Sequence, residues 1–285
     1  MTPKPSIFAQ YMIDWGKLCD VNGADITVWD YTTCFEFYPA IYPNLHVLRD
    51  NLQLFRENRA KGVYEQGYDN GGTEVLAGSA SGEFGELRAY MLAKLVWNPD
   101  LNSNRIMDEF MDAYYGKAAA PYIKQFIDFY TNKAIGTNHT GVFGRPEKFT
   151  YMNTFECRRM EKLFDEAERA SQYENCQTGL GQDYLLNIRR SRLCLRLYKA
   201  NMLIGEYSWF NPFRLSNNKR LFYDCVQLGV DRFSSFMVEP YNTYVWLHRP
   251  YDWGKMNSWI DIVDKTKTAV PMDLEAYRLA HPWIR

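Results

Sequence analysis

The stretch from residue 25 to residue 72 constrains the fold most, because two short apolar runs flank a segment with helical periodicity. Residues 26–31 (ITVWDY) and 62–67 (GVYEQG) each predict a brief strand that ends in polar or acidic residues. Between them, apolar side chains recur at helical spacing along one side of the segment: Leu45, Leu48, Leu52 and Phe55. A strand, a helix and a second strand form a βαβ unit, whose right-handed crossover makes the strands parallel. We therefore expect parallel strands at about residues 25–31 and 62–67.

The ends of the intervening helix carry residues that suit helix termini. Asn44, directly after Pro43, can accept a hydrogen bond from an unpaired backbone N–H at the start of the helix. Gly62 can adopt the left-handed conformation that often follows a helix. The sequence thus predicts a capped start at Asn44 and a glycine stop before the second strand.

Acidic residues close to the strand ends are candidates for chemistry, because ligands of parallel sheets bind at the carboxyl ends of the strands. Glycoside hydrolysis uses two carboxyl groups, and strands ~4.8 Å apart would bring Asp30 and Glu65 within a usable distance. Both can also be structural carboxylates that accept hydrogen bonds from backbone N–H groups or arginine. Alternation along the strand leaves open whether Asp30 or Trp29 faces a ligand.

Aromatic and amide side chains around these acids are candidates for substrate binding. Trp29 and Tyr31 offer flat rings for a sugar, although packing in the core explains them equally well. The other candidates are hydrogen-bonding residues of the strand ends and adjoining loops: Tyr64, Gln66, Tyr68, Asn70 and Glu36. The four histidines are isolated from serine or cysteine partners, which disfavours a nucleophilic triad.

Composition excludes some function classes. A formal net charge of -1 disfavours nucleic-acid binding, which needs a concentrated basic surface. Four arginines cluster on an expected helix, where a solvated face is favoured over an anion-binding patch: Arg189, Arg190, Arg192 and Arg196. Aromatic residues make up 16% of the chain, which is typical of carbohydrate-binding proteins but also of a core rich in tyrosine.

Neither a metal site nor a membrane span is expected. No window approaches the ~20 apolar residues that a transmembrane helix needs, and no export signal is evident. The six cysteines are scattered without a CxxC pair or a neighbouring histidine, so buried free thiols are the first interpretation and one or two disulfides the second. We expect no cofactor.

The rest of the chain has mainly helical periodicity. A helix over residues 6–18 places Ile7, Tyr11, Trp15 and Leu18 on one face. Residues 86–97 predict another, and apolar stripes recur from residue 102 onward, with a glycine-containing linker at 136–150 and a coil-like tail from Tyr241. The expected domains are a small α/β part at residues 1–98 and a helical part at 99–285.

Two parallel strands cannot form a stable sheet alone, and the order helix, strand, helix, strand, helix matches the last quarter of a (β/α)₈ barrel. Four stretches resemble one family in order: residues 28–31, residues 62–67, residues 87–99 (LRAYMLAKLVWNP) and residues 109–119 (EFMDAYYGKAA). Residues 8–130 are similar to the C-terminal half of a domain-of-unknown-function family of bacterial glycoside-hydrolase-like proteins. Their barrel is similar to those of α-glucuronidases and β-N-acetylhexosaminidases.

The resemblance implies a fold of class α/β plus α: the last two strand–helix units of a TIM-type (β/α)₈ barrel, followed by an all-α C-terminal domain. Residues 26–30 and 63–66 would be the seventh and eighth strands. The first six strands, and with them the proton-donating acid, have no counterpart here and would come from a missing N-terminal half in cis or in trans. The resemblance also suggests a periplasmic or cell-surface location.

The expected function is therefore that of the C-terminal portion of a glycoside-hydrolase-like protein. Asp30 and Glu65 would be its catalytic candidates, and an oligosaccharide or polysaccharide-derived substrate would be its ligand. The chain alone would not be catalytic. The alternative is a non-catalytic helical module that binds carbohydrate or another protein.

Overall fold

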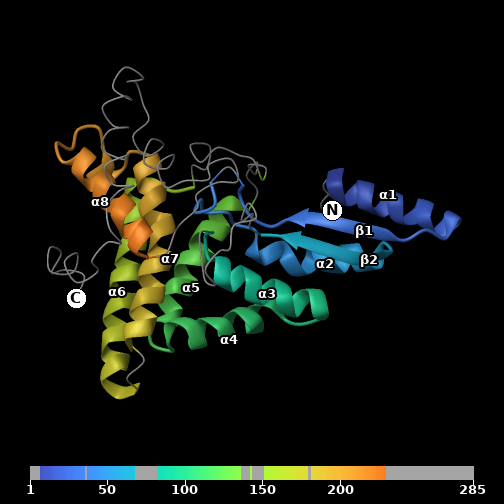
Figure 1. The fold of residues 1–285 in the computed structure, drawn as a ribbon, viewed down its shortest axis with the longest axis horizontal. Helices are drawn as coiled ribbons and strands as arrows, with labels where there is room; N and C mark the ends of the chain where they lie inside the picture. Colours follow the sequence, from blue (N-terminus) through green and yellow to red (C-terminus); the bar gives the residue numbers. More distant parts are fainter. Residues whose placement is uncertain are drawn as a thin grey trace, which may run out of the picture.

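The computed structural model describes residues 7–35, 37–67, 82–135, 142, 151–178 and 181–228. Within these ranges a pair of strands lies at one end of an otherwise helical structure (Figure 1). The elements are, in chain order, α1 (Ile7–Asn22), β1 (Ile26–Tyr31), η1 (Leu45–Val47), α2 (Leu48–Glu57), β2 (Ala60–Gln66), α3 (Gly85–Trp97), α4 (Ser103–Tyr115), α5 (Ala120–Ala134), α6 (Thr154–Thr178), α7 (Gly181–Asn201), η3 (Gly205–Tyr207) and α8 (Arg214–Gln227).

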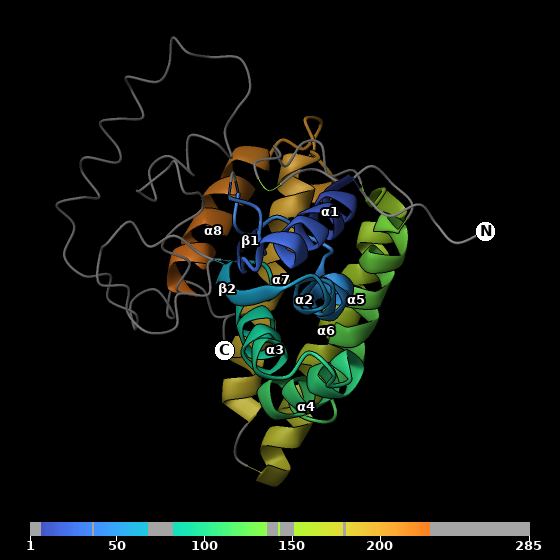
Figure 2. The ribbon, with the colours of Figure 1, turned by 90° about the vertical axis from the view of Figure 1, so that its right-hand side faces the viewer.

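The predicted parallel pairing of the two strands is confirmed. Val28 pairs with Val63 and Asp30 pairs with Glu65, after an irregularity between Ile26 and Thr27. The predicted apolar side of the intervening helix is also confirmed, because all four of its residues are buried: Leu45, Leu48, Leu52 and Phe55. Figure 2 shows that α1 and α2 lie on the same side of the two strands.

The expectation of a TIM-type barrel is wrong. In the described part of the chain the sheet has two strands, in the order β1–β2, and the remaining elements are helices. The eight strand–helix units of a barrel are therefore not present. A single βαβ unit is compatible with many folds, and the apolar periods that follow it form helices packed on helices instead of further strands.

The expected ends of the helix between the strands are also wrong. Asn44 makes no capping hydrogen bond, and its side-chain amide instead donates to the carbonyl of Thr32 at 2.9 Å. The left-handed residue is Arg59, with φ 67°, whereas Gly62 lies inside β2. Three acceptors hold the Arg59 guanidinium and offset the backbone strain: the Ala24 carbonyl and the carboxylates of Asp20 and Asp25.

The first helix is predicted correctly, but its apolar side faces solvent. Ile7, Tyr11, Trp15 and Leu18 are exposed, whereas Met12, Gly16 and Cys19 are buried. A Cβ atom added at Gly16 would lie 3.0 Å from the Cβ of Asn58, so this glycine permits the close approach of α1 to the end of α2.

One continuous apolar core joins the strand pair to the helices. It includes Val28 of β1, Leu52 of α2, Leu95 of α3, Phe126 of α5 and Ile188 of α7. A smaller cluster packs Phe37 against the far part of α7 and against α8. The division at residue 98 stays a prediction, although side chains from both sides of it share the larger core.

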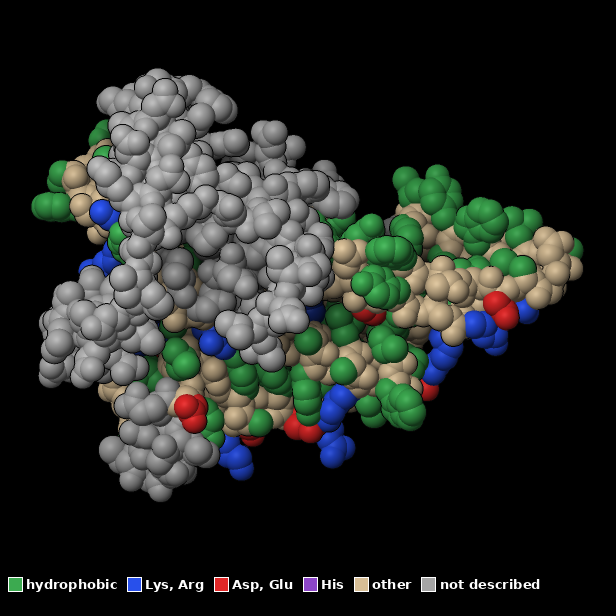
Figure 3. Space-filling view, viewed as in Figure 1, with side chains coloured by type: hydrophobic (Ala, Val, Ile, Leu, Met, Phe, Trp, Pro, Cys, Tyr) green, Lys and Arg blue, Asp and Glu red, His purple; other side chains and the backbone are tan. Residues whose placement is uncertain are grey.

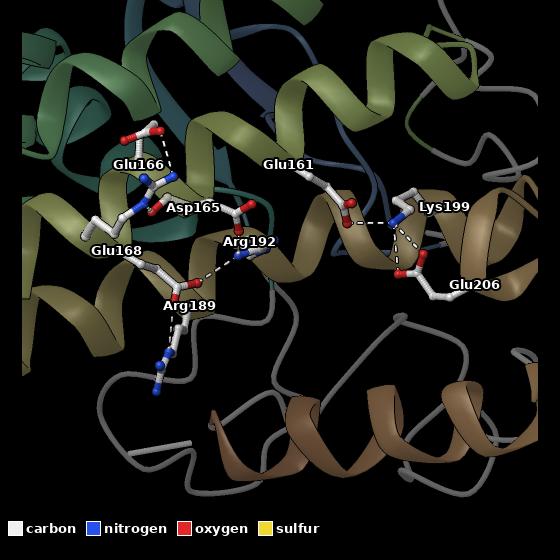
Figure 4. A network of polar contacts seen from close by, with 9 residues as sticks. Glu161, Asp165, Glu166, Glu168, Arg189, Arg192, Lys199 and Glu206 are labelled. Carbon is white, nitrogen blue, oxygen red and sulfur yellow. Dashed lines mark hydrogen bonds and ion pairs between the residues drawn. The ribbon is translucent and has the colours of Figure 1, made fainter. Parts of the chain in front are cut away.

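The arginine cluster of α7 is neither a solvated face nor an anion patch. Its side chains are about one-fifth exposed, and each pairs with an acid of another element: Arg189 with Glu168, Arg190 with Glu86, Arg192 with Asp165 and Glu168, and Arg196 with Asp224. Figure 4 shows the part of this network that joins α6 to α7 through Arg189 and Arg192. Ion pairing across the helix interface replaces solvation, because the partner helix brings carboxylates to the same side.

Lys199 is the most buried cation of this network. Its side chain is 3% exposed, and its Nζ atom lies 2.6 Å from Glu161 Oε1 and 2.7 Å from Glu206 Oε2 (Figure 4). The same atom lies 5.8 Å from the centre of the Tyr207 ring. Lys199 therefore joins α6 to the segment that follows α7.

Replacing this lysine tests how much the network stabilises the fold. We expect Lys199→Met to lower the free energy of unfolding by about 2–3 kcal/mol, because two partly buried carboxylates lose their shared cation. The matched control is Arg169→Ala, which breaks an exposed pair with Glu166 on the surface of α6 and should cost less than about 0.5 kcal/mol. Urea denaturation measures both, and equal effects would contradict a special role for Lys199.

Candidate functional site

The register of the strand pair divides the candidate residues between two faces. Successive side chains of a strand point to opposite sides, and residues paired across two strands share a side. Val28 belongs to the core, so Asp30 and its partner Glu65 lie on the helix-covered face with it. Trp29, Tyr31 and Tyr64 lie on the opposite face, where all three are exposed.

The exposed side of the sheet is called here the aromatic face and comprises Trp29, Tyr31, Tyr64 and Gln66. The residues Trp29 and Tyr64 are 62% and 56% exposed, and their ring centroids lie 4.9 Å apart at an interplanar angle of 66°. Trp29 Nε1 donates a hydrogen bond to Gln66 Oε1 at 2.7 Å. The tryptophan ring is thus held in one orientation while its surface stays open to a ligand.

The two acids form a half-buried carboxyl pair on the other face. Asp30 Oδ1 accepts a hydrogen bond from the backbone N–H of Tyr31 at 2.9 Å, while burial raises the pKa of Asp30. Burial, together with the charge of Asp30, raises the pKa of Glu65 to about 7. Glu65 Oε2 is buried and has no hydrogen-bond partner within the described residues. A proton on Glu65 therefore persists to near-neutral pH.

Three predicted site residues lie outside the described residues: Glu36, Tyr68 and Asn70. The same holds for most of the glycine-rich loop after β2, for the 136–150 linker except residue 142, and for the tail from Tyr241. The structure thus brings six candidates together at the strand pair. Two of them, Asp30 and Glu65, face away from the other four.

A buried polar chain next to the end of β1 was missed by the sequence reasoning. Arg88 Nη2 donates to Glu83 Oε2 at 2.7 Å, and the Tyr130 hydroxyl donates to the other oxygen of the same carboxylate. Arg88 Nη1 donates to the side chain of Asn44, which in turn donates to the carbonyl of Thr32. This chain ties α5 and the start of α3 to the residue that follows β1.

The residues of this buried polar chain have little in their sequence pattern that predicts their contacts. Arg88 follows Leu87 on the buried side of α3, where the apolar period alone predicts an ordinary core face. Glu83 stands just before that helix, where an exposed acid would be unremarkable. Its complete burial raises the pKa of Glu83 to about 7, against the opposing effects of Arg88 and Tyr130. Only the contact between the residues just before α3 and α5 shows that the three groups meet.

The described part of the chain contains neither a cluster of metal-ligating side chains nor a helix that could span a membrane. No group of three or more histidine, cysteine, aspartate or glutamate side chains there could hold a metal ion. Five cysteines are buried free thiols, as expected: Cys19, Cys34, Cys157, Cys194 and Cys225. Among the described helices, none combines the length and the apolar character that crossing a bilayer requires.

The carboxyl pair predicts a pH-dependent stability. Because the folded-state pKa of Glu65 is about 7, above its ordinary value of 4.5, the native state holds the extra proton and loses stability as pH rises from about 4.5 to about 7. Glu65→Gln should therefore stabilise the protein by about 1–2 kcal/mol at about pH 8, with solvent screening allowed for, and by almost nothing at about pH 4. Urea denaturation at both pH values measures this, and an equal gain at both would refute it.

The buried polar chain predicts a large cost for losing its cation. We expect Arg88→Met to destabilise the fold by about 3–5 kcal/mol, because the buried Glu83 carboxyl would lose its counter-charge and would either stay charged without a partner or have to take up a proton. The double variant Arg88→Met with Glu83→Gln should recover a substantial part of that loss. Tyr130→Phe, which removes a single hydrogen bond, should cost about 1 kcal/mol. Thermal or urea unfolding distinguishes these, and a double variant no better than the single one would contradict the pairing argument.

The comparisons with known proteins concern the first part of the chain. No curated protein and no solved structure matches the chain. Residues 2–128 match the model of a family described as Domain of unknown function (DUF4838). The predicted resemblance to a domain-of-unknown-function family is thereby confirmed, while its glycoside-hydrolase likeness stays a prediction. The matched part contains both strands and the aromatic face, so this region of the chain is similar to that domain of unknown function.

Proposed function

We propose that this chain binds carbohydrate on the aromatic face, as a part of a glycoside-hydrolase-like protein that is not catalytic alone. The observation that carries the proposal is the exposed pair of Trp29 and Tyr64, in which the Trp29 indole is oriented by a hydrogen bond to Gln66. Large aromatic rings are costly to leave in water, and a flat exposed ring offers a surface on which the C–H face of a sugar can stack.

The hydrogen bond to Gln66 supports a binding role in a further way. Without a partner for its Nε1–H, the ring of Trp29 could adopt several rotamers and would lose that freedom on binding. With the indole already oriented at 2.7 Å from Gln66 Oε1, less conformational entropy is lost when a ligand docks. Tyr31 extends the same surface, since its ring centre lies 6.4 Å from that of Trp29.

The carboxyl pair supports the non-catalytic part of the proposal. A glycosidase needs its two carboxyl groups on either side of the bond that is cleaved. Asp30 and Glu65 instead share the side of the sheet that carries Val28 and Val63, away from the aromatic face. A sugar on the aromatic face would therefore need acid groups from elsewhere, supplied in cis or in trans, for hydrolysis.

Titration calorimetry with a panel of hexasaccharides of glucose, xylose and N-acetylglucosamine tests the proposal. We expect Trp29→Ala and Tyr64→Ala each to weaken the binding of the preferred sugar by about tenfold or more, equivalent to about 1.4 kcal/mol. The matched control is Trp97→Ala, because Trp97 is 91% exposed but lies on α3, and this change should leave the affinity unaltered.

Two outcomes would contradict the proposal. One is the absence of binding to every sugar of the panel, or binding that Trp29→Ala leaves intact. The other is turnover of aryl glycosides by the purified chain, which would show that catalytic acids are already in place.

A second candidate is a helical module that binds carbohydrate or protein away from the strands. Trp209, Phe210 and Phe213, between η3 and α8, are exposed, and the Arg214 guanidinium stacks over the Trp209 ring at 4.2 Å. The same panel separates the two candidates. If Trp209→Ala abolishes sugar binding while Trp29→Ala does not, the site belongs to the helical part.

A further inference from the structure

The outer side of α1 carries an apolar stripe that the described part of the chain leaves mostly open, apart from an edge contact between the rings of Phe8 and Phe55. Its six members are each more than half exposed: Ile7, Phe8, Tyr11, Trp15, Leu18 and Val21. Figure 3 shows hydrophobic side chains gathered over α1 and over the neighbouring strands. Leaving so many large apolar groups in water is unfavourable, so the stripe indicates an interaction surface.

The stripe is large enough for a stable interface. Burying one large apolar or aromatic side chain hides roughly 100–250 Å², so the exposed parts of these six amount to on the order of 700 Å². The largest apolar patch of a typical monomer covers ~300–600 Å², and each partner of a standard interface contributes ~800 Å². The area is that of one side of a dimer contact.

The neighbouring strand edge is also open. Within the described residues β1 pairs with β2 only, so no strand covers its outer edge. β1 lies beside α1 in both views of the ribbon (Figures 1 and 2). An open strand edge favours the addition of another strand, and a two-stranded sheet is marginally stable until it gains one.

The charges of α1 do not oppose self-association. Lys17 lies 3.3 Å from Asp14 on the same helix, and Asp20 pairs with Arg59 after α2. The helix therefore presents a nearly neutral surface with acid and base side by side. A twofold axis would place Asp14 of one copy close to Lys17 of the other, so the pairs can exchange partners without repulsion.

We propose that a second copy of this chain covers the α1 stripe, in a twofold-symmetric dimer with antiparallel α1 helices and adjoining β1 edges. With the axis near Trp15, the two Trp15 side chains meet each other, and Tyr11 of one copy lies opposite Leu18 of the other. The two sheets join at β1 into one four-stranded sheet. The aromatic face lies on the side of the sheet opposite the α1 helices, so its rings stay open to a ligand and the dimer does not depend on the proposed sugar binding.

Sedimentation and light scattering of the full chain between about 1 and about 100 µM test the dimer. We expect twice the monomer mass at the upper concentration and dissociation on dilution. Leu18→Glu and Trp15→Glu should each weaken the dimer at least about 100-fold. Trp97→Glu, at an even more exposed apolar residue on α3, should leave the dimer unchanged. Far-UV circular dichroism reports whether each variant keeps its helices.

Hydrogen exchange of the wild-type chain provides a test that needs no variant. Backbone amides of α1 and β1 should exchange more slowly at about 100 µM than at about 1 µM, while those of α4 should not change. A wild-type chain that stays monomeric over this range would overturn the proposal. The α1 stripe would then be a binding surface for a different polypeptide. A dimer unaffected by Leu18→Glu, or assemblies larger than two copies, would also overturn it.

Discussion

The parallel pairing of β1 with β2 determines where every candidate side chain of this protein points. The pairing joins Asp30 to Glu65 and Trp29 to Tyr64 in register. Because the side chains of a strand alternate, a shift of one residue in either strand would exchange the two faces. The apolar side of α2 stabilises the observed register, because Val28 of β1 belongs to the same core as Leu52 and Phe55 of α2. The exposed aromatic pair and the half-buried acids are two consequences of the same contact.

The buried polar chain fixes the segment that follows β1. The Glu83–Arg88 pair is almost completely buried and is also bonded to Tyr130 and Asn44. A buried ion pair contributes little net stability compared with apolar side chains of the same size, but it requires specific partners. Here that requirement connects α3, α5 and the end of β1. The polar chain therefore specifies the position of the strand end more than it strengthens the core.

Most of the local structure follows from periodicity in the sequence. The spacing of Leu45, Leu48, Leu52 and Phe55 predicts a helix with one buried side, and all four are buried. The stripes of α4 and α5 are predicted in the same way. Helix ends are harder, because several residues can adopt the required conformation. Arg59 is left-handed instead of Gly62, since three acceptors near Arg59 offset the strain. The barrel was predicted from one βαβ unit and a resemblance, and neither contains the contacts that close a sheet.

The sequence by itself determined which side chains share a face, because the alternation of a strand and the period of a helix are local properties. It placed Ile7, Tyr11, Trp15 and Leu18 together, and Asp30 apart from Trp29. Only the tertiary structure decided which of these faces is covered. The apolar side of α1 faces outward because Gly16 and Met12 pack against α2. Likewise, Asp30 and Glu65 face the helices because Val28 joins the core. Burial depends on contacts between segments distant in the chain, and no local pattern contains them.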